Sequence, residues 1–310
     1  MKILIVCSVN KGWVVPFISE QVDNLEKLGH SVEWLKVDSK GLKGYWNKRK
    51  ELKEKIKSFN PDIIHAHYGL CGLLANFQRK VPVVTTYPGS DINVPKVRIL
   101  SMLSLILSKY NIFMSKRQIE KVSLFLSKKT SEIIRYGVDE KIFIEVDKDI
   151  ARDKLGFSKK EKLVMFAGKF ANPVKNAELA KDAVKILENV TLLEMTGGYT
   201  KVEMNLLYNA VDVALLTSYS EGSPQFIKET MMTGCPIVSV DVGDVAEVVE
   251  GLEGCYIAER NPQDIANKLQ QALSLNSRTK GRERIIELGL TNDLVAKKLV
   301  EIYEEVLKNN

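Results

Sequence analysis

The sequence contains few cysteines and histidines, and it has no long apolar run. The four cysteines form no CxxC pair, so we expect buried thiols in a reducing compartment instead of a disulfide framework. His65 and His67 stand close together, but no cysteine or carboxylate lies beside them at metal-ligand spacing. The apolar runs are far shorter than the roughly 20 residues that span a bilayer, and no signal-peptide pattern opens the chain. We therefore expect a cytoplasmic protein with no metal site.

Charge is distributed unevenly over the 310 residues. Residues 1–150 contain 25 Lys and Arg against 16 Asp and Glu, whereas residues 151–310 contain 20 against 23. A basic first half predicts an anionic partner there, either a phosphate-bearing substrate or an acidic membrane surface. No nucleic-acid recognition motif accompanies these charges, so we do not expect nucleic acid as a partner.

Strand-like apolar runs alternate with amphipathic helical stretches in two series. The alternation is typical of an α/β protein with parallel sheets covered by helices. A charged stretch over residues 140–160 interrupts it, and we place a domain boundary near residue 148. The ten expected strands are 2–7, 31–37, 62–67, 82–87, 111–115, 162–168, 190–195, 211–218, 236–242 and 254–259. Ligands of such doubly wound sheets bind at the carboxyl ends of the strands.

One short helix is predicted at such a strand end. Ser223 is suited to cap it, Pro224 to occupy its first position, and Gly234 to end it, so the helix should run from 224 to about 233. Its N-terminus would present free N–H groups to an anion such as a phosphate.

Two carboxylates flank this helix start. Glu221 precedes the helix, and Glu229 lies in its second turn. Carboxylates in this position can accept hydrogen bonds from the hydroxyls of a sugar or ribose. Exposed glutamates are also common on loops and helices, and the spacing alone favours this second interpretation.

Motifs along nearly the whole chain resemble those of the GT-B retaining glycosyltransferases of family four. EGSPQFIKE is similar to the E-x7-E motif of that family, and GKFANPVKN (168–176) to its GR…KN loop. The strings TYPGSD (86–91), RYGVD (135–139) and PDIIHAHYG (61–69) resemble its HGSD loop, NGVD linker entry and HxH strand end. Several motifs in the family's order carry more weight than any one of them.

This resemblance implies a GT-B fold of two Rossmann-like, doubly wound domains that face a cleft. Residues 1–148 would form the acceptor-binding domain and residues 149–290 the nucleotide-sugar-binding domain. Residues 291–310 would form a final helix that crosses back to the first domain.

The resemblance also assigns roles around the E-x7-E motif. Glu229 would bind the ribose hydroxyls of the donor, and Glu221 would lie against the hydroxyls of the donor sugar. Backbone N–H groups near the helix start would approach the sugar and the phosphates, namely those of Gly222, Ser223, Gln225 and Phe226.

A second loop would hold the diphosphate. Lys169 and Lys175 would neutralise its charge as it leaves, although a solvated basic loop is the alternative from the residues alone. Gly168 opens this loop, and Gly197 and Gly198 resemble the family's glycine-containing loop near the nucleotide. A glycine pair by itself more often marks a turn.

Two positions depart from the family pattern. Lys169 stands where arginine is common, which keeps the charge but loses the planar bidentate geometry. Pro88 replaces the histidine of the HGSD loop, and proline supplies neither a donor nor a charge. His67 is the nearest candidate to fill that role, or else a structural histidine at a strand end.

The implied reaction is a retaining, metal-independent transfer of sugar from a UDP- or GDP-linked donor, with no further cofactor. The acceptor would be a glycan or a lipid-linked molecule, in the synthesis of a surface polysaccharide. Pro88 leaves a non-catalytic, sugar-nucleotide-binding partner subunit as the alternative, and an epimerase as a minor one.

Two helices of the first half have open interpretations. Residues 43–57 combine Tyr45 and Trp46 with six lysines and an arginine, and they could lie on an anionic membrane or pack as a solvated helix through Leu52 and Ile56. The apolar helix at 97–107 is expected in the core, with a groove for an acceptor lipid as the alternative.

Overall fold

The computed structural model describes residues 1–9, 12–38, 41–126, 130–275 and 277–309. The chain divides into two compact units, the first formed by Met1–Gly137 with Asn292–Asn310 and the second by Val138–Thr291. The first boundary thus lies before residue 148, because the segment after Val138 is bonded to the second unit. The backbone N–H of Ile144 donates to the side chain of Asn205 at 3.0 Å, for example.

A parallel sheet of six strands organises the first unit, in the order β2-β1-β3-β4-β5-β6. Five strands match the expected positions closely. The sixth, β6, was not predicted, because its sequence TSEI is short, partly polar and only half-buried. The bounds are β1 Lys2–Ser8, β2 Ser31–Val37, β3 Ile63–His67, β4 Val83–Tyr87, β5 Tyr110–Phe113 and β6 Thr130–Ile133.

Helices cover both faces of this sheet. The bounds are α1 Pro16–Lys27, α2 Gly41–Asn47, α3 Arg49–Phe59, α4 Gly69–Asn76, α5 Ser90–Asn93, α6 Pro95–Leu107, α7 Lys116–Glu120, α8 Ser123–Leu126 and α16 Asn292–Lys308. Alternate side chains of β1 point to opposite faces. Ile3 and Ile5 pack with residues of α1 and α16, whereas Leu4 and Val6 pack with residues of α3 and α4.

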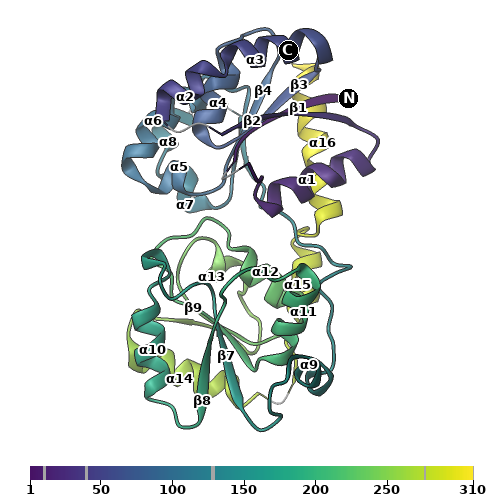
Figure 1. Ribbon diagram of the computed structural model, residues 1–310. Coiled ribbons are helices and arrows are strands. Elements are labelled where there is room, and N and C mark those ends of the chain that lie inside the picture. Colours follow the sequence, from purple (N-terminus) through teal and green to yellow (C-terminus); the bar gives the residue numbers. More distant parts are fainter. Residues whose placement is uncertain (10–11, 39–40, 127–129, 276, 310) are drawn as a thin grey trace. The chain divides into compact units, whose positions relative to one another are not determined.

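The last helix of the chain belongs to the first unit. In α16, Leu299, Ile302 and Tyr303 are buried in the same core cluster as Ile3 and Ile5 of β1. The helix lies beside α1, as Figure 1 shows, so the chain returns to its first unit after completing the second.

A parallel sheet of five strands organises the second unit, in the order β11-β10-β9-β7-β8. The strands are β7 Lys162–Phe166, β8 Val190–Glu194, β9 Val213–Leu216, β10 Ile237–Val240 and β11 Cys255–Ala258. The helices are α9 Lys148–Leu155, the 3-10 helix η1 Pro173–Lys175, α10 Ala177–Lys185, α11 Lys201–Ala210, α12 Gln225–Met232, α13 Val245–Val248, α14 Pro262–Leu273 and α15 Gly281–Glu287. Both sheets confirm the α/β prediction.

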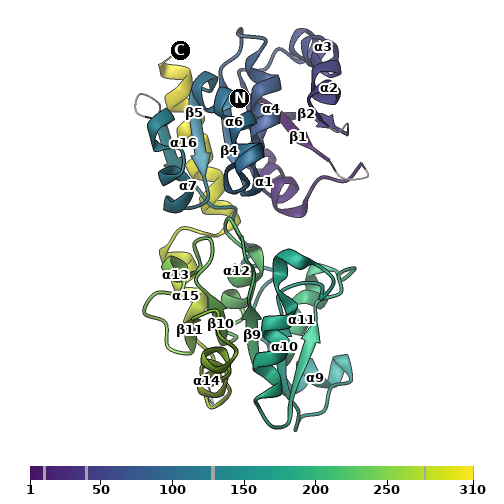
Figure 2. The ribbon, with the colours of Figure 1, turned by 90° about the vertical axis from the view of Figure 1, so that its left-hand side faces the viewer.

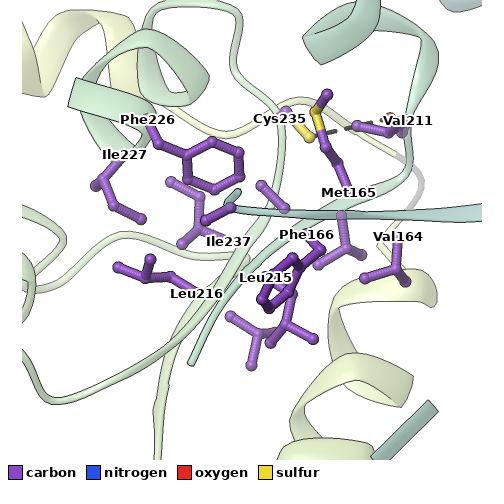
Figure 3. Packing of buried hydrophobic residues seen from close by; sticks show 14 of the residues in the cluster. Val164, Met165, Phe166, Val211, Leu215, Leu216, Phe226, Ile227, Cys235 and Ile237 are labelled. Atoms are coloured by element: carbon purple, nitrogen blue, oxygen red, sulfur yellow. Dashed lines mark hydrogen bonds between the residues drawn. The ribbon is translucent and has the colours of Figure 1, made fainter. Parts of the chain in front are cut away.

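Central strands and α12 share one apolar core in the second unit. Figure 3 shows the Phe226 ring and Ile227 of α12 beside Ile237, Leu215 and Phe166 from three strands. Burial of such side chains stabilises the fold by about 1.5–3 kcal/mol each. This packing fixes α12 against β7, β9 and β10.

Two predicted helices have different bounds. The helix expected from 224 begins at Gln225, because Pro224 is the N-cap with an extended ψ of 123°. The single helix expected over 43–57 is two helices that break at Lys48, and α3 packs through the buried Leu52. Among the described residues, every helix is too short or too polar to span a bilayer.

The four cysteines are free thiols, as expected. Cys7, Cys71 and Cys235 are buried, and Cys255 is half-buried. Burial raises the pKa of Cys7 to about 12, which keeps this thiol protonated and unreactive.

Candidate functional site

The sequence-predicted residues of the second unit gather at the carboxyl edge of its sheet. β7 is the first strand of this unit, and it pairs with β8 on one side and β9 on the other. The chain therefore changes direction between β7 and β9, and such switch points bind ligands in open α/β sheets. Lys169 and Lys175 follow β7, Glu221 lies in the loop after β9, and Glu229 lies on α12, the helix that follows this loop.

Lys175 and Glu221 form an ion pair between these two loops. The Nζ atom of Lys175 lies 2.7 Å from Oε1 of Glu221, and the two side chains are only 23% and 16% exposed. Thr217, at the end of β9, donates its hydroxyl to the carbonyl oxygen of Lys175 at 2.9 Å. These contacts bring a cation and a carboxylate together at the switch point.

The β7 end also places Lys169 beside two glycines. Gly168 has a φ of +145°, and a Cβ there would lie 3.0 Å from Cγ of Lys175, so a larger residue would push on the paired lysine. A Cβ on Gly197 would lie 3.6 Å from Cε of Lys169. The loop after β7, with Gly168 and Lys169, thus lies beside Gly197 in the loop after β8. Gly198 is the next residue of that second loop.

The loop before α12 is closely packed against the loop after β10. A Cβ on Gly243 would lie 2.7 Å from the carbonyl oxygen of Gly222 and 3.3 Å from Cβ of Glu221. Gly243 also has a φ of +61°, which favours glycine. The close approach of the two backbones determines where Glu221 lies.

The start of α12 differs in one contact from the expectation. Ser223 does not cap the helix, and its hydroxyl accepts a hydrogen bond from Nζ of the buried Lys228 at 3.2 Å. Gln225 and Phe226 are the first two helical residues, so their N–H groups lie at the positive end of the helix dipole. Pro224 has no N–H to contribute.

Glu229 is held by a tyrosine that the sequence analysis missed. The hydroxyl of Tyr208 on α11 donates to Oε2 of Glu229 at 2.7 Å. Burial and the neighbouring carboxylate raise the pKa of Tyr208, so its hydroxyl stays protonated and remains a donor. Tyr208 fixes one carboxylate oxygen and therefore orients the other.

Arg260 is a second residue that the sequence analysis missed. It follows β11 and donates to the carbonyl oxygens of Thr217 at 3.1 Å and Ser218 at 2.7 Å. Its guanidinium lies 5.4 Å from the ring centroid of Tyr219. Arg260 ties the end of β9 to β11, and its only sequence signal is its place after a strand.

His67 lies in the first unit and is fully buried. Its Nδ1 atom hydrogen-bonds the hydroxyl of Tyr136 at 2.8 Å, whereas its buried Nε2 has no partner among the described residues. Burial, followed by the influence of His65, lowers the pKa of His67 well below its ordinary value. The ring is therefore neutral, and it can offer a hydrogen bond but no charge.

Pro88 lies just after β4, close in sequence to a buried carboxylate. Asp91 accepts hydrogen bonds from the backbone N–H of Gly89 at 3.0 Å and of Gly69 at 3.2 Å. Burial raises the pKa of Asp91 to about 6. Asp91, on α5, thus joins the start of α4 to the loop that contains Pro88.

No three histidine, cysteine or carboxylate side chains come together as metal ligands within the described ranges. The string DKD at 147–149 lies at the start of α9. Asp147 is the N-cap of α9 and accepts a hydrogen bond from the backbone N–H of Ile150 at 3.0 Å.

Comparison with known proteins agrees with this arrangement. Residues 162–275 match the family described as "Glycosyl transferases group 1", and residues 6–126 match "Glycosyl transferase 4-like". The two matches cover most of both units. The chain therefore belongs to the group 1, family-four-like glycosyltransferases.

Named relatives are similar at low identity. TuaC of Bacillus subtilis, assigned by its name to teichuronic acid biosynthesis, is 23% identical over 69% of this chain and 62% of its own length. The D-inositol 3-phosphate glycosyltransferase of Mycobacterium marinum is 22% identical over 71% of this chain and 57% of its own length. The matched region thus spans only about three fifths of these two relatives.

Similar structures show the fold. Sucrose-phosphate synthase of Thermosynechococcus elongatus superposes with a TM-score of 0.84 at 15% identity, over all of both chains. HepE of Anabaena, in complex with UDP, superposes with a TM-score of 0.78 at 15% identity, over 98% of this chain and all of that chain. The architecture is the GT-B fold.

Proposed function

We propose that this chain is a retaining glycosyltransferase that moves a sugar from a nucleotide-sugar donor to a glycan or lipid-linked acceptor. The observation that carries the proposal is the Lys175–Glu221 pair at the β7–β9 switch point, with Glu229 one helix turn beyond the start of α12. A cation and a helix N-terminus can bind the phosphates of a nucleotide sugar, and the carboxylates can accept hydrogen bonds from its hydroxyls.

Each residue has a distinct role in this proposal. Lys169 and Lys175 neutralise the diphosphate as negative charge develops on it, a type of stabilisation that contributes strongly to catalysis. Glu221 accepts hydrogen bonds from the donor sugar, and Glu229, oriented by Tyr208, accepts them from the ribose. Gly222, Ser223, Gln225 and Phe226 offer backbone N–H groups to the sugar and phosphates.

The chemical step needs no protein nucleophile. The bond between the anomeric carbon and the leaving phosphate oxygen breaks, and a bond to the acceptor hydroxyl oxygen forms on the same face. The proton of that hydroxyl moves to the leaving phosphate oxygen. The family resemblance supports this metal-independent scheme, in which the lysines carry the charge of the product.

The donor is UDP- or GDP-linked in this proposal, and the UDP complex of HepE favours UDP. The first unit would bind the acceptor, because its basic residues suit a phosphate-bearing or lipid-linked molecule. The neutral His67 is the candidate to supply the hydrogen bond of the family histidine, which Pro88 cannot replace. TuaC, by its name, favours a role in polysaccharide synthesis.

Calorimetric titration of the wild type and Glu229→Ala with UDP, GDP, ADP and their sugar conjugates tests the donor site. We expect one nucleotide to bind the wild type and to bind the variant at least tenfold more weakly. Incubation of the wild type with the sugar conjugate of that nucleotide should release the free nucleotide. Equal binding by both proteins would reject the role of Glu229.

A second candidate is a non-catalytic, sugar-nucleotide-binding subunit, favoured by Pro88. It predicts binding through Glu229 without turnover, even with acceptor mixtures. Release of an epimerised sugar without acceptor would instead identify an epimerase.

A further inference from the structure

Helix α6 is arranged with its apolar side facing outward. Ile99, Leu103 and Ile106 follow a spacing of three to four residues, so they share one face of the helix. These three side chains are 67%, 54% and 44% exposed, and Leu100 beside them is 36% exposed. The prediction that this helix lies in the core was therefore wrong for this face, which we call the outer face of α6.

Small polar residues occupy the inner face of the same helix. Ser101 and Ser104 are fully buried, and they face α4, the neighbouring helix in Figure 2. A Cβ on Gly69 would overlap Ser101, and one on Gly72 would overlap Ser104. The two helices approach closely through these four residues, so the large apolar side chains of the outer face have no place between them, whereas Leu105 of α6 is buried in a neighbouring core cluster.

Neighbouring helices extend the apolar surface. On α8, which contacts α6, Leu124 is 89% and Phe125 42% exposed. On the other side, α2 and α4 line an apolar groove of about 440 Å³ between Trp46, Leu73 and Phe77. Soluble proteins rarely expose so many large apolar side chains on adjacent helices without a binding partner.

The charges around this surface have one dominant sign. Residues 94–126 contain six lysines and arginines and a single acidic residue, Glu120. Lys96 precedes Ile99 by one helix turn, and therefore lies at the end of the outer face. The pKa of Lys121 is lowered first by burial and then by the nearby positive charges of Arg98 and Arg117. An apolar face bordered by cations complements a layer of anionic headgroups over acyl chains.

We propose that the outer face of α6, with Leu124 and Phe125 of α8, docks on a bilayer that contains anionic phospholipid. The apolar side chains enter the acyl boundary, and the neighbouring lysines and arginines contact the phosphate groups. The inference deepens the proposed function and rests on it, since a lipid-linked acceptor would require the first unit to work at a membrane surface. The basic helix α3 is not needed for this contact.

Sedimentation with vesicles tests the proposal, using the full chain and no donor. We expect binding to vesicles of equal parts phosphatidylglycerol and phosphatidylcholine, and weak binding to phosphatidylcholine alone. The double variant Ile99→Gln/Ile106→Gln should partition at least about tenfold less, because two apolar side chains no longer leave water. Lys96→Gln should weaken binding about fivefold, from about 1 kcal/mol per cation near the surface.

A matched control is available in the second unit. Ile186 and Ile286 are 45% and 44% exposed, and Ile186→Gln/Ile286→Gln should leave vesicle binding unchanged. Equal losses in both double variants, or equal binding to both kinds of vesicle, would overturn the proposal. A third result would also overturn it: the wild type is a dimer that does not bind vesicles, and Ile99→Gln/Ile106→Gln is a monomer. A second copy of the chain would then cover the outer face of α6.

Donor hydrolysis without vesicles separates this inference from the proposed function. The rate should be the same in the wild type and in Ile99→Gln/Ile106→Gln, because these residues lie outside the donor site. Hydrolysis without vesicle binding would reject the docking surface alone. Vesicle binding without any turnover would reject the transferase and leave the surface standing.

Discussion

Lys175 and Glu221 are 46 residues apart in the sequence, and their side chains meet at 2.7 Å between the loops that follow β7 and β9. The pair joins the two loops on either side of the switch point, where the strand order reverses. A diphosphate that binds there would compete with Glu221 for the lysine. In the proposed function, the carboxylate would then be available to the sugar hydroxyls, and the ion pair would hold both groups in place for a donor.

Replacing either member should affect activity far more than stability. We expect Glu221→Gln and Lys175→Ala to lower kcat/KM by about 100- to 1000-fold, the usual effect of removing one group that stabilises transition-state charge. The free energy of unfolding should fall by about 1 kcal/mol, because the pair is only partly buried. Donor turnover and urea denaturation measure the two effects.

The Glu178–Lys181 pair on α10 provides the control. Its Nζ–Oε1 distance is 3.1 Å, but it lies one turn apart on an exposed helix face. Glu178→Gln should change neither turnover nor stability measurably. A comparable loss of turnover in this variant would mean that general charge, not the switch-point pair, governs activity.

Tyr208→Phe should weaken nucleotide binding without unfolding the second unit. The ring of Tyr208 is fully buried, with Phe226 at 5.7 Å and Phe143 at 6.0 Å between ring centroids, and phenylalanine keeps these contacts. Loss of the hydrogen bond removes one of the contacts that orient Glu229, so we expect the Kd for the nucleotide to rise about fivefold. Calorimetry measures it.

Tyr208→Phe combined with Glu229→Ala forms a double-mutant cycle. If the tyrosine acts only through the carboxylate, adding Tyr208→Phe to Glu229→Ala should cause no further loss of binding. Additive losses would show that Tyr208 contributes to the nucleotide site independently.

The E-x7-E helix and every strand except β6 could be predicted because their signals are local. Apolar runs bounded by charge identify β1 and β7, and Gly234 with Pro236 marks the end of α12. The long-range contacts had no such signal. Tyr208 reaches Glu229 across 21 residues, and Arg260 reaches Ser218 across 42, so only the folded chain shows that they belong to the site.

Helix α6 shows a different limit of sequence analysis. Its apolar composition predicts burial, but composition does not identify which neighbour covers which face. Ser101 and Ser104 lie on the same face of α6. The glycines of α4 that they pack against lie about 30 residues earlier in the chain. Pairing these two small-residue faces requires the tertiary structure.

Gly243→Ala should disturb the donor site through the position of Glu221. The substitution places a Cβ 2.7 Å from the carbonyl oxygen of Gly222, so the loop before α12 must move. We expect a loss of about 2–4 kcal/mol in unfolding free energy, from backbone strain and overpacking together. Turnover of the folded fraction should fall at least about tenfold.

Gly251→Ala separates strain from the clash. Gly251 has a φ of +74°, close to the +61° of Gly243, but a Cβ there meets no atom within 4 Å. This control should lose about 1–2 kcal/mol of stability and keep full turnover. Unchanged turnover in both variants would contradict the proposed link between Gly243 and Glu221.

Asp91 should make the stability of the chain depend on pH between about 4 and 6. Burial raises its pKa from 3.8 to about 6, so the folded state binds the proton more tightly than the unfolded state does. The carboxyl is protonated in both states below this window, and above it the folded chain carries a buried charge. Its contribution to stability therefore falls as pH rises through the window, by an amount on the order of 3 kcal/mol.

The variant Asp91→Asn removes this titration and isolates its effect. Burial lowers the pKa of His65 to about 3. Its contribution to the stability of the folded chain therefore rises with pH, opposite to that of Asp91, because folding weakens its affinity for the proton. The informative quantity is thus the difference in unfolding free energy between the wild type and Asp91→Asn, measured by urea denaturation at pH 4 and pH 7. Asparagine cannot accept both N–H bonds equally well, so the variant is weakened at either pH. The wild type should lose its advantage over the variant as the pH is raised, and a constant difference would show that Asp91 does not titrate in this window.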